Sequence, residues 1–120
     1  MKITQEMVKQ SYFVAKQIYE KKIVNTEGKY IVSECTGMKL GSANDYINAF
    51  TSMVTGKEYK RTINNFATKF YLENIKNDFG TEMLIKAIES VDKHLKYYNT
   101  LNHGNLKGIE NIVQKYKDQL

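Results

Sequence analysis

Apolar residues recur every three or four positions along almost the whole chain, which is the spacing of an amphipathic helix. The spacing is clearest between Thr81 and Thr100, where the apolar positions are Leu84, Ala87, Ile88, Val91, Leu95 and Tyr98. The chain contains no proline, as expected for helices that are not kinked or interrupted. No two segments form a convincing pair of strands. The sequence therefore predicts an all-α fold, a compact bundle of five to six helices.

Capping and turn residues set the expected helix boundaries. We expect Thr4 to cap a first helix that runs to about Val24, and Asn25-Thr26-Glu27-Gly28 to break it. The segment from Lys29 to Thr36 favours a strand by propensity but has no partner strand. We therefore predict a short helix that ends at Gly37.

The remaining helices are predicted in the same way. Ser42 is the expected N-cap of a helix that carries Asp45 in its first turn and ends at Thr55, with Gly56 as a left-handed stop. Later helices are expected from Thr62, as the cap, to about Asp78, from Thr81 to about Thr100, and from Leu106 to Leu120. With no linker or repeat in 120 residues, we predict a single helical domain over residues 1–120.

The charge balance is moderately basic, with 18 Lys and Arg residues against 13 Asp and Glu residues. This balance is compatible with binding to nucleic acid. Arg61 is the single arginine, and bidentate recognition of a base or a phosphate normally uses arginine. If DNA is the partner, the composition therefore favours contacts to its backbone over reading of its bases.

No catalytic, metal or cofactor site is expected from the residues available. The two histidines, His94 and His103, and the single Cys35 are too few and too scattered for zinc. A nucleophilic pair of Cys35 with a histidine lacks any orienting motif. We instead expect Cys35 to be a small buried core residue and His94 to be partly buried and hydrogen-bonded. The sequence Gly56-Lys57 is not a phosphate-binding loop, because Glu58 follows the lysine.

Cellular location follows from two further features. The single cysteine fits a reducing compartment. The chain shows neither a signal peptide nor an apolar run long enough to span a membrane, so we expect a cytoplasmic protein without membrane or small-molecule partners.

Two short stretches combine cations with aromatic residues, as surfaces that bind nucleic acid do. The first follows Gly56 and the second lies near the end of the helix expected from Thr81. Adjacent tyrosines at 97 and 98 cannot both face the core, because neighbours on a helix differ by about 100°. The candidate nucleic-acid-binding residues are Lys57, Tyr59, Lys60, Arg61, Thr62, Lys93, Lys96 and Tyr97.

A set of spaced residues between Tyr30 and Tyr98 carries a resemblance to a known family. The set is Thr36-Gly37-Met38, Ser42-Ala43, Tyr46-Ile47, Phe50, Met53, Gly56, Tyr59, Arg61-Thr62-Ile63-Asn64, Phe79-Gly80, Ala87, His94 and Tyr97-Tyr98. It resembles the helical N-terminal module that precedes HNH-type nuclease domains in some bacterial restriction-like proteins.

The resemblance implies a module that lies beside a nuclease and helps to place it on DNA or to pair its subunits. It implies that Arg61 and Thr62 contact DNA, with Tyr59 and His94 as supporting residues. No HNH metal-binding segment follows in this sequence, so we expect no cleavage by this chain. The function predicted is a non-catalytic DNA-binding module of a bacterial HNH-nuclease or restriction-like defence system. The alternative is a protein-interaction or dimerisation module without DNA affinity, whose partner is a second copy or a nuclease domain.

Overall fold

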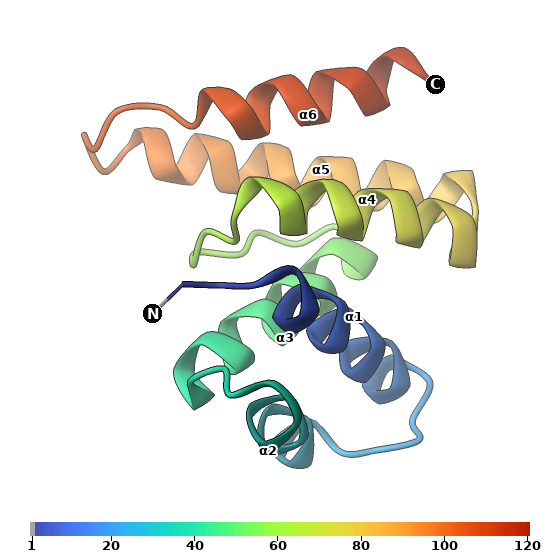
Figure 1. The fold of residues 1–120 in the computed structure, drawn as a ribbon. Helices are drawn as coiled ribbons and strands as arrows, with labels where there is room; N and C mark the ends of the chain where they lie inside the picture. Colours follow the sequence, from blue (N-terminus) through green and yellow to red (C-terminus); the bar gives the residue numbers. More distant parts are fainter. Residues whose placement is uncertain (1) are drawn as a thin grey trace. The chain divides into compact units, whose positions relative to one another are not determined.

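A computed structural model describes residues 2–120, and all regular structure among them is helical (Figure 1). The helices are α1 (Gln5–Tyr19), α2 (Asn25–Thr36), α3 (Leu40–Thr55), α4 (Asn65–Phe79), α5 (Thr81–Asn99) and α6 (Lys107–Asp118). The prediction of an all-α chain with five to six helices is confirmed.

The chain divides into two compact units, Met1–Thr51 and Ser52–Leu120. Helix α3 begins in the first unit and ends in the second. One helical domain over residues 1–120 stays a prediction.

In the first unit, α1 packs against α2, and the beginning of α3 joins their core. Thr4 caps α1 as predicted, since its hydroxyl accepts a hydrogen bond from the Met7 N–H at 3.2 Å. The ring of Tyr12 is fully buried and meets the ring of Phe50 edge-on, with 5.3 Å between their centroids. Aromatic pairs of this geometry stabilise a core beyond the area that they bury.

The predicted break at residues 25–28 is wrong, because these residues form the first turn of α2. The chain leaves α1 at Tyr19 instead, five residues before the expected end, and Lys21 takes a left-handed conformation with φ of 62°. Gly28 is buried in α2 because α1 passes very close to it: a Cβ atom there would lie 2.6 Å from Cδ1 of Ile18. A glycine that sequence rules treat as a helix breaker is here a packing residue.

The prediction that residues 29–36 are helical is confirmed, and α2 ends at Gly37 with φ of 79°. Two predictions about neighbouring residues are wrong. Cys35 is exposed, not buried. Ser42 lies inside α3 and does not cap it, because the first helical hydrogen bond runs from the Ala43 N–H to the Lys39 carbonyl at 2.9 Å.

The second unit consists of the end of α3, a connecting segment of residues 56–64, and three helices that pack on one another. The chain reverses direction between α4 and α5 and again before α6, so these helices run side by side (Figure 1). Gly80 alone joins α4 to α5 and has φ of 94°. Asn64, not Thr62, caps α4, since its side chain accepts from the Ala67 N–H at 2.8 Å.

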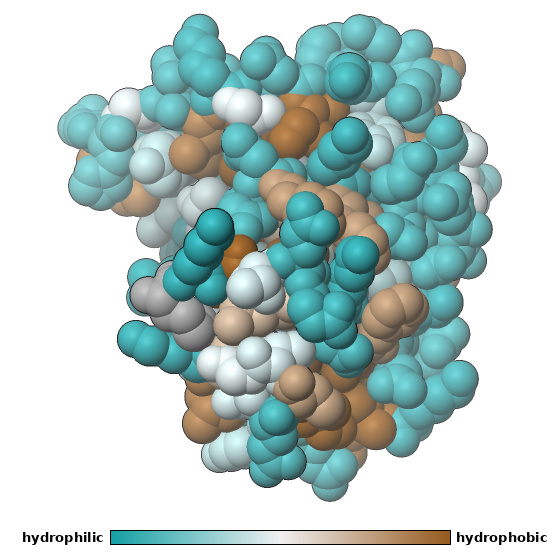
Figure 2. Space-filling model, in the orientation of Figure 1, coloured by the Kyte–Doolittle hydropathy of each residue, from teal (hydrophilic) through white to brown (hydrophobic). Residues whose placement is uncertain are grey.

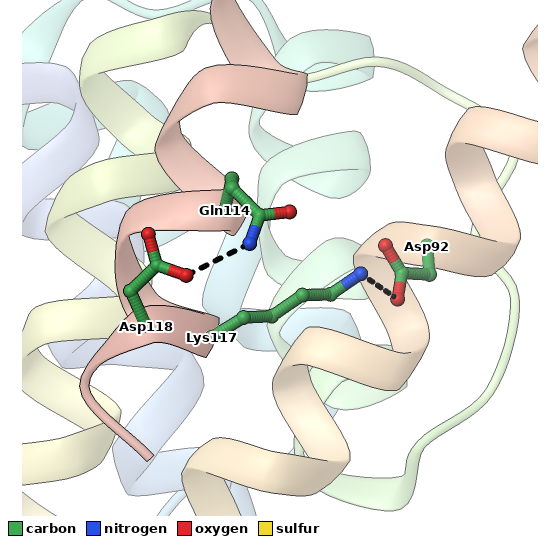
Figure 3. Close-up of polar contacts among 4 residues, drawn as sticks. All are labelled: Asp92, Gln114, Lys117 and Asp118. Atoms are coloured by element: carbon green, nitrogen blue, oxygen red, sulfur yellow. Dashed lines mark hydrogen bonds and ion pairs between the residues drawn. The ribbon is translucent and has the colours of Figure 1, made fainter.

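Polar contacts attach α6 to its neighbours. Lys117 of α6 reaches Asp92 of α5, with 2.9 Å between Nζ and Oδ2, and Gln114 donates to Asp118 within α6 at 2.9 Å (Figure 3). The hydroxyl of Tyr116 donates to Glu73 of α4 at 3.2 Å. Exposed pairs of this kind contribute about 0–1 kcal/mol each, so apolar burial provides most of the attachment.

Hydrophilic side chains cover most of the face drawn in Figure 2, and hydrophobic side chains reach it in separate patches. Among residues 2–120, no helix combines the length and the apolar character that crossing a bilayer requires.

Candidate nucleic-acid interface

The connecting segment after α3 starts with a glycine turn. The residues that follow this turn lie against α5. Gly56 has φ of 68°, as predicted for a left-handed helix end. The Gly56 N–H donates to the Met53 carbonyl and the Lys57 N–H donates to the Ser52 carbonyl, at 3.3 and 2.9 Å. This pair of hydrogen bonds is the Schellman motif, which satisfies the last carbonyls of the helix. The chain turns away from α3 at this motif, and the basic residues follow in the connecting segment.

Side chains from one face of α5 hold the segment in place by binding its backbone carbonyls. The hydroxyl of Ser90 donates to the Lys57 carbonyl at 2.5 Å. The ammonium of Lys93 donates to the Gly56 carbonyl at 2.7 Å. Residues three and four apart lie on the same side of a helix, so positions 90, 93 and 94 form one row along the segment.

His94 completes this row and is fully buried. Its Nδ1 lies 2.6 Å from the Tyr59 carbonyl, which can only accept, so Nδ1 carries the proton. Its Nε2 lies 2.8 Å from the Thr62 hydroxyl. Burial lowers the pKa of His94 below the usual value, against the opposing effects of the Tyr59 hydrogen bond and the Glu58 charge. In the neutral imidazole Nε2 has no proton, so the Thr62 hydroxyl donates to it.

These contacts revise the roles expected of two candidate residues. Tyr59 is 6% exposed and its ring stacks on His94, with 4.4 Å between centroids and 10° between planes. Tyr59 therefore presents no exposed ring to a ligand. Burial also raises the pKa of its phenol well above the usual value. Thr62 is exposed, but its hydroxyl is engaged with His94 and does not cap α4. Both residues position the segment.

The cationic candidates come from two parts of the chain: three belong to the segment, and two belong to α5, where Lys93 binds the Gly56 carbonyl. All are exposed, and they are Lys57, Lys60, Arg61, Lys93 and Lys96. Within residues 2–120, none of these five forms an ion pair with a carboxylate. The acidic residues beside them are Glu58, Glu89 and Asp92, of which Glu89 lies near Gly56 and Asp92 pairs with Lys117. The region therefore has a local excess of positive charge.

Lys60 and Tyr97 directly join the two predicted stretches. The Nζ atom of Lys60 lies 5.3 Å from the centroid of the Tyr97 ring, within the distance of a cation–π contact. The Tyr97 ring is half-buried and lies 6.5 Å from the His94 ring on its own helix. The fold thus brings the 57–62 stretch and the 93–97 stretch together, although thirty residues separate them.

Ser90 is the one residue of this arrangement that sequence reasoning missed. It is fully buried and polar, and it precedes His94 by one helical turn. A serine on the apolar side of the helix, one turn before a histidine, was the available signal, because buried polar groups need hydrogen-bond partners.

The arrangement contains a single histidine and no cysteine. Within residues 2–120, no three His, Cys, Asp or Glu side chains lie together as metal ligands. Both ring nitrogens of His94 are engaged in holding the segment. What the site offers a ligand is positive charge and one aromatic ring.

Comparison of the chain with protein-family models, with curated protein sequences and with solved structures finds no match.

Proposed function

We propose that this chain is a non-catalytic DNA-binding module whose basic face contacts the phosphate backbone. The basic face consists of Lys57, Lys60, Arg61, Lys93 and Lys96. The observation that carries the proposal is that two stretches in direct contact carry five exposed cations, none of which pairs with a carboxylate among residues 2–120. Unpaired cations are available to neutralise phosphates, and release of the counterions of DNA then favours binding.

The way in which the segment is held supports the same function. Three side chains of α5 bind its carbonyls, so its lysines and Arg61 start from a fixed backbone. A fixed backbone reduces the conformational entropy that ordering the segment on a ligand would cost. By the resemblance between Tyr30 and Tyr98, the module would place a nuclease of a bacterial restriction-like system on its DNA.

Fluorescence anisotropy of a labelled duplex at several salt concentrations tests the proposal. We expect measurable affinity at low salt that falls steeply as salt rises. Arg61→Ala should weaken binding and reduce the slope of log K against log salt by about 1, the loss of one phosphate contact. Lys115→Ala is the matched control, because Lys115 is an exposed cation on α6 outside the basic face. Absence of binding at low salt, or equal effects of the two variants, overturns the proposal.

The alternative function, a dimerisation module, is favoured by an apolar groove on α4. The groove has a volume of about 380 Å³ and is lined by Phe66, Lys69, Phe70, Glu73, Asn74 and Asn77. The rings of Phe66 and Phe70 stack there with 5.8 Å between centroids. A stable dimer by light scattering that is indifferent to DNA, and that Phe70→Ser converts to a monomer, would support this function instead.

A further inference from the structure

The ring of Tyr97 marks a place where a base, and not only a phosphate, fits the basic face. One side of the ring carries the Lys60 ammonium at 5.3 Å. Lys60 is exposed and belongs to the connecting segment, so this cover is a flexible side chain and not packed core. The ring itself is half-buried on α5, with the His94 ring 6.5 Å from it.

We propose that the basic face binds single-stranded nucleic acid, with one unpaired base stacked on Tyr97 in the place that Lys60 now occupies. This proposal rests on the proposed function and names its substrate class. A base on Tyr97 displaces the Lys60 ammonium sideways, where it meets a phosphate of the same strand. Neighbouring phosphates then lie on Arg61, Lys93 and Lys96.

Stacking of a base on an aromatic side chain is stronger than a cation–π contact at an exposed position, so replacing the Lys60 ammonium with a base on Tyr97 is favourable. The displaced Lys60 also gains a phosphate partner, since among residues 2–120 of the free protein no carboxylate pairs with it.

Two features favour a single strand over a duplex. The bases of a duplex are stacked on one another and present only their edges, so an aromatic face such as that of Tyr97 has no base face to cover. The cations are also mostly lysines, which act as point charges along a backbone, whereas reading base edges in a groove favours arginine.

The experiment compares three labelled probes of equal length: oligo(dT) of about twelve nucleotides, the same backbone with abasic sites, and a duplex. Anisotropy gives the affinity of the full chain for each. We expect the native protein to bind oligo(dT) about tenfold more tightly than the abasic strand, since only the bases differ. Tyr97→Leu should lose this difference while keeping its affinity for the abasic strand. Tyr97→Phe should retain it, and so should Tyr30→Leu, which alters an exposed tyrosine of the first unit.

The outcomes separate the two proposals. Equal affinity for oligo(dT) and the abasic strand, or tighter binding to the duplex, overturns base stacking but leaves the phosphate-binding function standing. Absence of salt-sensitive binding to all three probes overturns both. The comparison of native protein on two strands does not depend on any variant, so a folding defect in Tyr97→Leu cannot obscure the result.

Discussion

Replacing His94 with leucine should lower the free energy of unfolding by about 3 kcal/mol, because the imidazole is the centre of the contacts that hold residues 56–62. The buried Tyr59 carbonyl loses its donor and is left unpaired, which costs about 1–3 kcal/mol. The Thr62 hydrogen bond is partly exposed and contributes about 0.5–1.5 kcal/mol. Loss of the ring stack with Tyr59 adds about 0.5–1.5 kcal/mol. Leucine returns a few tenths through its better helix propensity, about 0.5 kcal/mol at most.

Urea denaturation followed by helical circular dichroism measures this loss. His103→Leu is the matched control, because His103 is exposed in the turn before α6 and should change stability by less than about 0.5 kcal/mol. A loss of less than about 1 kcal/mol in His94→Leu would refute the reasoning, because the calculation requires at least one unpaired buried carbonyl.

The difference in stability between the native protein and His94→Leu should depend on pH. The folded-state pKa of His94 is lowered, so the unfolded chain takes up a proton more readily than the folded one. The stability that neutral His94 provides is therefore complete above the unfolded-state pKa near about 6.5 and is lost as pH falls through the folded value. The difference in stability between native protein and His94→Leu should shrink from pH 7 to pH 5. A difference that stays constant would show that His94 does not titrate differently on folding.

Four further substitutions test packing, backbone geometry and a buried hydroxyl by the same denaturation assay. Gly28→Ala should destabilise by about 1–2 kcal/mol, since its Cβ meets Ile18 and overpacking outweighs the gain in helix propensity. Gly41→Ala, in open space on α3, should instead be neutral or stabilising, and equal effects of the two would contradict the close approach of α1 and α2. Gly56→Ala should cost about 1–2 kcal/mol because φ is 68°, although no atom blocks the Cβ closely; an unchanged midpoint would argue against the left-handed turn. Tyr59→Phe should be neutral or slightly stabilising, because among the described residues the buried phenol oxygen has no hydrogen-bond partner; a loss above about 1 kcal/mol would reveal one.

Helix content and several helix ends could be predicted because they depend on local chemistry. Thr4 caps α1 through a hydrogen bond three residues away, and Gly37 and Gly56 end helices through a backbone conformation that glycine adopts easily. Where the prediction failed, contacts from other helices outweighed local propensity. Gly28 lies inside α2, at a position where α1 passes so close that a Cβ atom would meet Ile18.

The candidate interface also contains features that the sequence predicts and features that depend on tertiary contacts. The composition of residues 57–62 and 93–97 was enough to predict exposed cations there, since lysine and arginine side chains are almost never fully buried without a partner. Nothing local distinguishes the buried Tyr59 from the half-buried Tyr97, because each is a tyrosine next to lysines in the sequence. Their difference comes from the His94 ring, which covers Tyr59.

The sequence by itself therefore determined the helical class, the excess of positive charge and the residues that carry it. Only the tertiary structure decided that Ser90, Lys93 and His94 hold the segment after Gly56, and that Lys60 lies on Tyr97. The physical reason is the range of the interactions. Helix periodicity and capping act within about four residues, which the sequence displays directly. Hydrogen bonds between residues more than thirty positions apart depend on how the helices pack, and packing is a property of the whole core.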